Sequence, residues 1–119
     1  MVRGAPTAPP VTDERPKRSM PYFAVEYDVV DRFVERRAPF RDAHLELIRA
    51  AHARGEIVMA GAVGQPPQGA LIVFKVATAA EAEDFVLHDP YVVNGLVTRW
   101  LIQPWQVVVE PQTTIGSKG

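Results

Sequence analysis

The sequence of 119 residues contains no cysteine and only three histidines. The absence of cysteine excludes disulfides, thiolate nucleophiles and cysteine-ligated metal sites. The histidines do not have the spacing of a ligand set, so we predict no bound metal. The chain also lacks a P-loop and a G-x-G-x-x-G motif, and no serine stands at a strand-to-helix elbow. We therefore expect no cofactor and no serine hydrolase site.

Long apolar runs and an excess of either charge are missing as well. No apolar stretch approaches the length of a transmembrane helix, and the N-terminus has no apolar segment typical of a secretory signal. The formal net charge of -1 gives no indication of a nucleic-acid or anionic-membrane partner. A cysteine-free chain also fits a reducing compartment. We therefore expect a cytoplasmic protein whose partner is a small molecule.

The composition changes near residue 20. Residues 1–19 contain four prolines and almost no large apolar side chain, which predicts a disordered N-terminal tail. The tail is basic and could contact a partner, but a solvated extension is the simpler interpretation. We predict one folded domain over residues 20–110 and a frayed C-terminal tail over residues 111–119.

The spacing of apolar residues along the sequence divides the domain into predicted strands and helices. The predicted strands are about 22–27, 56–63, 70–76 and 100–109, and the predicted helices are about 39–54 and 78–88. Gly55 follows the first helix as its C′ residue, and Thr78 with Glu81 predicts a capping box for the second. Pro104 indicates an edge position or a bulge in the last strand. The order β-α-β-β-α-β is typical of an α+β, ferredoxin-like fold with one antiparallel sheet.

The predicted strands carry more apolar surface than two helices on one face of a sheet can cover. The large side chains among them are Phe23, Ile72, Phe74, Trp100 and Trp105. We therefore expect two sheets to pack face to face in a homodimer.

Asp89 is an unusual carboxylate, because Pro90 follows it and disfavours the helical conformation in the preceding residue. We expect Asp89 at the C-terminal end of the second helix, where the helix dipole disfavours a negative charge. It therefore needs a positive or proton-donating partner. The best candidate is His44, which lies on the predicted apolar face of the first helix. A carboxylate beside an imidazole fixes the tautomer and stabilises the imidazolium, as in general acid–base catalysis.

Arg37 and Arg41 precede His44 by seven and three positions, so a helix that included all three would carry them on one side. Such arginines bind carboxylate or phenolate oxygens. Less specific interpretations stay open at this point. His44 also fits a satisfied core histidine, the arginines fit a solvated helix face, Asp89 fits an ordinary turn residue and Tyr91 fits a packed aromatic.

Several motifs together resemble the YCII-related, or YciI-like, family. They are Arg41-x-x-His44-Leu45, Gly55 and Gly61 around the second strand, Asp89-Pro90-Tyr91-Val92-x-x-Gly95-Leu96, and Pro104-Trp105. The match covers about residues 20–110, and the Asp-Pro-Tyr-Val-x-x-Gly run is its most specific element.

The resemblance implies a dimeric α+β barrel of ferredoxin-like subunits, with a pocket between the sheet and the helices. It implies a functional His–Asp pair, here His44 and Asp89. The candidate substrate-binding residues are then Arg37, Arg41, Gly61 and Tyr91. Most members of the family have no known activity, and at least one is a dehydrochlorinase of a chlorinated hydroxyhydroquinone.

The leading hypothesis is a cofactor-free acid–base enzyme that acts by elimination or isomerisation on a small, oxygenated cyclic or aromatic substrate. In it His44 moves a proton, Asp89 orients the imidazole and Arg41 holds an anionic oxygen. No activated nucleophile is visible, which disfavours hydrolysis. The alternative is a non-catalytic ligand-binding or accessory module that uses the same pocket. A third reading gives the basic tail a regulatory role.

Overall fold

The computed structural model describes residues 20–111. The tail predicted over residues 1–19, and all but the first residue of the tail predicted over 111–119, lie outside this range. The elements in chain order are β1 (Tyr22–Val29), α1 (Phe33–Arg36), the 3-10 helix η2 (Ala38–Phe40), α2 (Arg41–Ala53), β2 (Ile57–Val63), β3 (Gly69–Lys75), α3 (Ala79–His88), α4 (Pro90–Val93) and β4 (Val97–Trp105).

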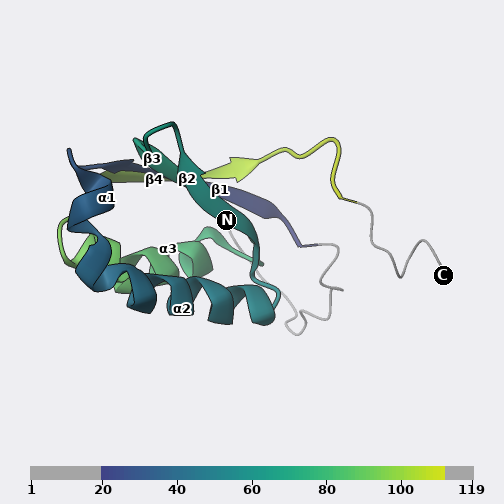
Figure 1. Ribbon diagram of the computed structural model, residues 1–119. Coiled ribbons are helices and arrows are strands. Elements are labelled where there is room, and N and C mark those ends of the chain that lie inside the picture. The colour runs from purple at the N-terminus through teal and green to yellow at the C-terminus, as the bar shows by residue number, and fades with distance from the viewer. Residues whose placement is uncertain (1–19, 112–119) are drawn as a thin grey trace.

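The four strands form one antiparallel sheet in the order β2-β3-β1-β4. Helices α2 and α3 lie on the same face of this sheet (Figure 1), and two side views show the same layering. This confirms the predicted α+β, ferredoxin-like fold. Within residues 20–111, no helix combines the length and the apolar character needed to cross a membrane.

Alternation along β1 explains the core. Phe23, Val25 and Tyr27 face the helices and are buried, whereas Glu26 and Asp28 are exposed on the opposite face. The neighbouring strand β3 and the inner faces of α2 and α3 complete this apolar cluster. A second, smaller cluster of Phe33, Tyr91 and Leu96 lies where α1, α4 and the start of β4 meet. The small cluster supports one wall of the site described below.

The last strand differs from the prediction. It covers Val97–Trp105 instead of residues 100–109. The reason is its partner: Trp105 pairs with Tyr22, the first residue of β1, so no paired strand is left for the residues that follow. Pro104 lies in an edge strand, as predicted.

Two local predictions about helix ends need correction. Thr78 is the N-cap residue of α3, but its side chain makes no capping hydrogen bond, so the predicted capping box with Glu81 is absent. The helix predicted to begin near residue 39 begins as η2, and α2 itself starts at Arg41. Gly55 has a φ of 82°, which fits its predicted role as the residue that follows the helix.

Candidate functional site

A cavity of about 320 Å³ lies between α1, α2 and the β2 side of the sheet. This is the lower end of the range for small-molecule pockets, about 300–1,000 Å³. One part of its wall is apolar, from Phe33, Leu45, Ile48, Ala60, Ala62, Pro67, Ala70 and Ile72. The rest is polar or main chain, from Tyr27, Arg37, Arg41, His44, Gly61 and Tyr91.

Asp89 joins two helices directly behind this cavity. It is the C-cap residue of α3 and the N-cap residue of α4, in an extended conformation imposed by Pro90. Its Oδ1 accepts a hydrogen bond of 3.0 Å from the backbone N–H of Tyr91. The sequence prediction placed Asp89 only at the unfavourable end of a helix. The structure confirms this position and adds that the same residue also begins the next helix, where a carboxylate stabilises free N–H groups.

The carboxylate of Asp89 is fully buried and accepts three hydrogen bonds. His44 Nδ1 lies 2.8 Å from Oδ1, and the hydroxyl of Tyr27 donates to Oδ2 over 2.6 Å. Together with the Tyr91 N–H, these donors offset the desolvation of a buried charge. The predicted meeting of His44 and Asp89 is therefore present in the structure.

The pairing assigns the tautomer of His44. A carboxylate only accepts hydrogen bonds, so Nδ1 carries the hydrogen that points at Asp89. Nε2 of the neutral ring then keeps its lone pair. Because the side chain of His44 is 13% exposed and lines the cavity, the imidazole is accessible to a bound molecule.

Tyr27 is a site residue that the sequence interpretation missed. It lies on β1, lines the cavity and holds the second oxygen of Asp89. Burial raises the pKa of Tyr27 far above its ordinary value, and the charge and hydrogen bond of Asp89 raise it further. The hydroxyl therefore stays a donor. The only signal in the sequence was its position on the inner face of β1, which an apolar aromatic side chain would fill equally well.

Two aromatic rings help to fix the position of the imidazole. The ring of Tyr91 stacks on that of His44, with centroids 3.8 Å apart and planes 10° apart. The ring of Phe33 packs edge-on against the ring of Tyr91, and the two centroids are 5.3 Å apart. Since Asp89 holds one nitrogen and Tyr91 holds one face, the orientation of His44 is determined by packing as well as by hydrogen bonding.

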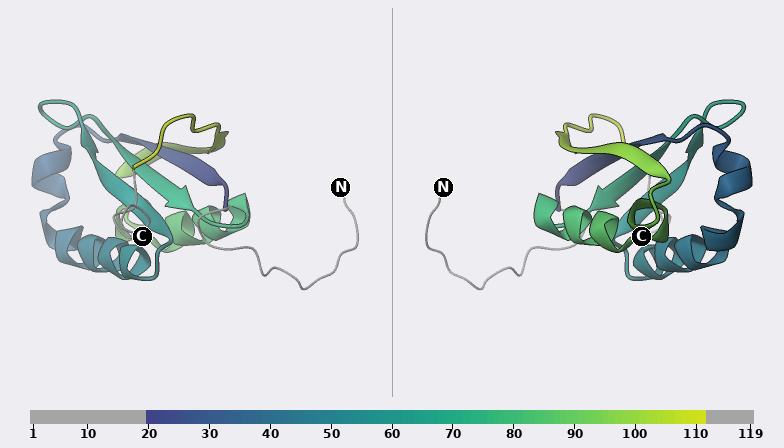
Figure 2. Two further views of the ribbon diagram at one scale, coloured as in Figure 1. Left: turned by 90° about the vertical axis from the view of Figure 1, so that its right-hand side faces the viewer. Right: turned by 90° about the vertical axis from the view of Figure 1, so that its left-hand side faces the viewer.

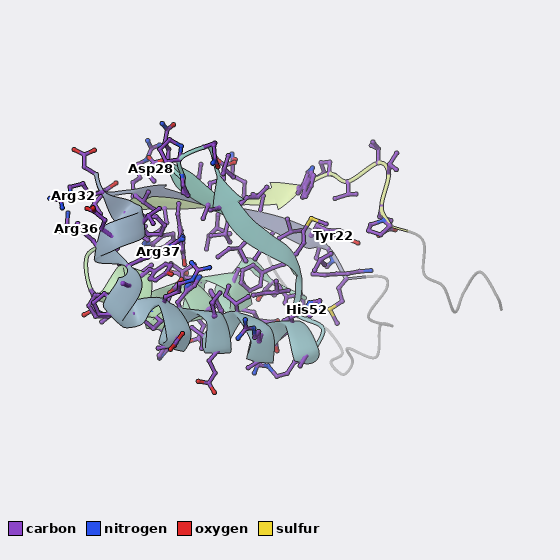
Figure 3. The ribbon with its side chains drawn as sticks, in the orientation of Figure 1. Tyr22, Asp28, Arg32, Arg36, Arg37 and His52 are labelled. Carbon is purple, nitrogen blue, oxygen red and sulfur yellow. The ribbon has the colours of Figure 1, made fainter. Side chains whose placement is uncertain are left out.

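Two arginines give the cavity a positive wall. Arg41 is the first residue of α2, and Arg37 is the C-cap residue of α1, with its guanidinium 5.2 Å from the centroid of the Phe33 ring. Figure 3 shows Arg37 turned toward the layer between sheet and helices, while Arg32 and Arg36 lie on the outer side of α1. Arg37 precedes η2 and α2, so the three residues do not share one continuous helix, but all of them line the same cavity.

The remaining predicted site residue, Gly61, contributes to the cavity wall from the edge strand β2. A Cβ at this position would meet no atom within 4 Å, so the absence of a side chain is not needed to fold the single chain. The other two histidines do not line the cavity, and each contacts a backbone carbonyl oxygen. His52 Nδ1 lies 2.8 Å from the carbonyl oxygen of Ile57, and His88 Nδ1 lies 2.8 Å from that of Asp84.

The chemistry available in the cavity is acid–base chemistry. None of the described residues that line it is a serine, threonine, cysteine or lysine. Across residues 20–111, no three metal-binding side chains of the His, Cys, Asp and Glu types gather in one place. The reactive group that remains is the imidazole of His44, flanked by cations and by phenol hydroxyls.

All three tyrosines have a raised pKa. Burial raises the pKa of Tyr27 and Tyr91, and burial together with the hydrogen bond to Glu110 raises the pKa of Tyr22 from 10.0 to about 12. Tyrosine in an unfolded chain ionises near pH 10. The unfolded state therefore loses these protons first. The contribution of these raised pKa values to the free energy of unfolding is fully present below about pH 10, and it is lost as the pH rises through the pKa values of the folded state.

We expect an ultraviolet titration of the folded protein to show no tyrosinate formation around pH 10. Tyrosinate should appear at higher pH, together with loss of the far-ultraviolet circular dichroism of the fold. A full tyrosine equivalent ionising near pH 10 while the circular dichroism stays native would contradict this prediction. The Tyr22→Phe variant identifies the step that belongs to the exposed Tyr22–Glu110 pair.

The comparisons with known proteins agree with this architecture. The model of the YCII-related domain matches residues 20–106, well over half of the chain. A solved structure with the same fold is the 5-chloro-2-hydroxyhydroquinone dehydrochlorinase of Burkholderia phenoliruptrix AC1100 in complex with 2,5-dihydroxybenzoquinone. It is 18% identical, has a TM-score of 0.61, and the match covers 71% of this chain and 93% of that chain. At this identity the likeness establishes the shared fold. No curated protein matches the chain.

Proposed function

The chain belongs to the YCII-related domain family, and on this premise we propose that it is a cytoplasmic enzyme that moves protons without a cofactor. Its substrate is a small, oxygenated cyclic or aromatic molecule, and the reaction is an elimination or an isomerisation. The observation that carries the proposal is the 2.8 Å contact of His44 with the buried Asp89, beside a cavity of about 320 Å³. A paired, oriented imidazole next to open volume is the arrangement that general base catalysis needs.

In the proposed reaction, Nε2 of His44 takes a proton from a carbon or oxygen of the substrate. The electron pair of the broken bond moves into the ring of the substrate. In an elimination a leaving group such as chloride departs with its bonding electrons, so the net products are the unsaturated ring, a proton and the anion. In an isomerisation the imidazolium returns the proton to another atom. Neither reaction requires an electron donor or acceptor.

The other site residues bind and orient. Asp89 holds the imidazole and stabilises the imidazolium that forms, and Tyr27 holds Asp89. Arg41 and Arg37 bind an anionic oxygen of the substrate, and Gly61 contributes main chain to the wall of the same cavity. The apolar wall favours a ring over an extended polar chain.

The solved neighbour supports the choice of substrate class. Its name describes removal of chloride from a chlorinated hydroxyhydroquinone, and its complex contains a dihydroxybenzoquinone. Both are small oxygenated rings, which fit a cavity of this size and this mixture of cations and apolar surface.

The proposal is tested by incubating the purified chain with a panel of chlorinated hydroxyhydroquinones and their quinone forms. We expect chloride release, or exchange of a ring hydrogen with deuterium from D2O, above the rate without protein. Calorimetry on the same panel measures binding. Binding of panel members without chloride release or exchange would refute the enzyme and support the alternative, a non-catalytic ligand-binding module.

We also propose that the enzyme is a homodimer formed by the sheet face opposite the helices. Strand register places Met59, Val63, Leu101 and Trp105 on this face, and each is at least 41% exposed. Four large apolar side chains on one uncovered face favour an interface with a second copy.

Light scattering tests the homodimer. We expect a dimer at micromolar concentration, and we expect Leu101→Glu to weaken it by about 100-fold or more because like charges would meet in an apolar interface. Leu87→Glu is the matched control, since Leu87 is an exposed leucine on α3 and away from this face. A wild-type monomer, or equal effects of the two variants, would contradict the proposed interface.

A further inference from the structure

The hydroxyl of Tyr91 is buried without a hydrogen-bond partner. Tyr91 is 3% exposed, and among the described residues its Oη is the one buried side-chain polar atom that has no partner. A buried polar group that is left unpaired costs about 1–3 kcal/mol. Such groups are rare in folded proteins, and each calls for a physical reason.

The hydroxyl is also rigidly placed. The backbone N–H of Tyr91 is bound to Asp89, its ring stacks on His44, and Phe33 meets the ring edge-on. The side chain therefore cannot rotate to find another partner. Tyr91 lines the cavity beside the imidazole that carries the proposed chemistry, and its hydroxyl oxygen is itself buried.

Charge around the hydroxyl is positive on the cavity side. Burial raises the pKa of Tyr91, while the nearby Arg37 and Arg41 oppose this shift and Asp89 adds to it. The net direction is upward, so the hydroxyl stays protonated and can donate at neutral pH. Arg41 opposes the rise in the pKa both through its charge and through a hydrogen-bonding contact of its side chain with Tyr91, although this contact lacks the geometry of a full hydrogen bond.

We propose that the Tyr91 hydroxyl, Arg41 and Arg37 form an oxyanion subsite that binds a phenolate or enolate oxygen in its ionised form. The hydroxyl donates one hydrogen bond to this oxygen, and the two guanidinium groups balance its charge. A single hydroxyl donor beside two guanidinium groups can serve one oxygen on an unsaturated carbon. The apolar part of the cavity wall, which includes Phe33 and Ile72, packs against the ring that carries this oxygen.

The subsite narrows the substrate class to acidic phenols and enols. Where His44 removes a proton from carbon, the charge that develops on the conjugated oxygen arrives at Tyr91 and the arginines. Groups placed where charge develops lower the barrier, and removal of one such donor typically slows catalysis by about 10²–10³-fold. The catalytic consequence rests on the function proposed above, whereas the binding of the anion does not.

The test uses 4-nitrophenol as a probe, because its absorbance distinguishes the phenol from the phenolate. We expect the folded chain to bind the phenolate at least about 10-fold more tightly than the neutral phenol. The pKa of the bound 4-nitrophenol should then be lower than that of the free probe by about one unit or more. Tyr91→Phe and Arg41→Gln should each weaken phenolate binding by about 10-fold. Arg49→Gln, an exposed arginine of the same helix outside the cavity, should leave it unchanged.

Equal affinity for the two forms of the probe would overturn the subsite, as would Tyr91→Phe binding the phenolate like wild type with native circular dichroism. Tighter binding of 4-nitrobenzoate than of the phenolate would overturn the single-oxygen assignment. His44→Gln separates this inference from the proposed enzyme, since we expect it to bind the phenolate within about threefold of wild type. If His44→Gln loses turnover and keeps phenolate binding, both the proposed enzyme and the oxyanion subsite are supported. If His44→Gln keeps full turnover, the proposed role of His44 is refuted and the subsite is not affected.

Discussion

Replacement of His44 by glutamine is expected to lower kcat/KM by about 10²–10⁴-fold, the usual contribution of general acid–base catalysis. A glutamine amide can still donate a hydrogen bond to Asp89 and fill much of the same volume, but it cannot accept a proton near neutral pH. Asp89→Asn should produce a loss of similar size for a different reason. Its amide oxygen can keep the contacts with His44 and the Tyr91 N–H, while its NH2 group takes the place of Oδ2 and the Tyr27 hydroxyl must turn to accept a hydrogen bond from it. The charge disappears and the positions of the heavy atoms are kept.

The double variant makes this prediction specific. If His44 and Asp89 act as one unit, as proposed, the double variant should be no slower than the slower single variant within about threefold. His52→Gln is the control, since His52 lies on the same helix and contacts a carbonyl oxygen away from the cavity. Rates are measured on the best substrate of the panel. Multiplicative losses, or equal losses in His52→Gln, would mean that the pair is not the reacting unit.

The second large effect concerns folding. Asp89→Ala removes the acceptor of three hydrogen bonds at once and leaves the Tyr27 hydroxyl, His44 Nδ1 and the Tyr91 N–H without partners. Loss of an N-cap costs about 0.5–2 kcal/mol, and each buried donor left unpaired costs about 1–3 kcal/mol. We expect the free energy of unfolding to fall by about 3–5 kcal/mol.

Urea unfolding measures this loss, with the m-value checked for two-state behaviour. Asp84→Ala is the matched control, because Asp84 is an exposed carboxylate of α3 with a side chain 78% exposed. A surface change of this kind should stay within about 0.5 kcal/mol. Tyr27→Phe removes one hydrogen-bond donor and keeps the ring. Its loss in the free energy of unfolding should lie between those of Asp89→Ala and Asp84→Ala. A loss below about 1 kcal/mol for Asp89→Ala would refute the proposed role of this carboxylate in holding β1, α2 and α4 together.

The sequence was sufficient for the fold because each long element has a clear period. β1 alternates between buried and exposed residues, and α2 and α3 carry apolar faces. His44 and Asp89 could be predicted from their positions. His44 is a polar residue on the apolar face of a helix, and Asp89 is a carboxylate at the C-terminal end of a helix, where the dipole disfavours a negative charge. The limits of β4 could not be found, since they depend on where β1 ends and not on the residues of β4.

Other features depend on tertiary contacts that no local pattern contains. Tyr27 satisfies the alternation of β1 whether or not its hydroxyl is used, so its contact with Asp89 is invisible in the sequence. Helix α4 has only four residues, too few to show a helical period. The double role of Asp89 as the end of one helix and the start of the next was therefore hidden. The unpartnered hydroxyl of Tyr91 is a property of the packed structure alone.

The position of Asp89 between two helices also separates what must stay constant from what can change. The His44–Asp89 pair is anchored to β1, α2 and α4, whereas another part of the cavity wall comes from β2 and the β2–β3 loop, including Ala60, Ala62 and Pro67. Insertions or substitutions in that loop would reshape the binding space and leave the imidazole where it is. We expect the chain to be an adaptable scaffold, in which new substrates are accommodated by exchanging the loop of one hairpin around an unchanged proton-transfer centre.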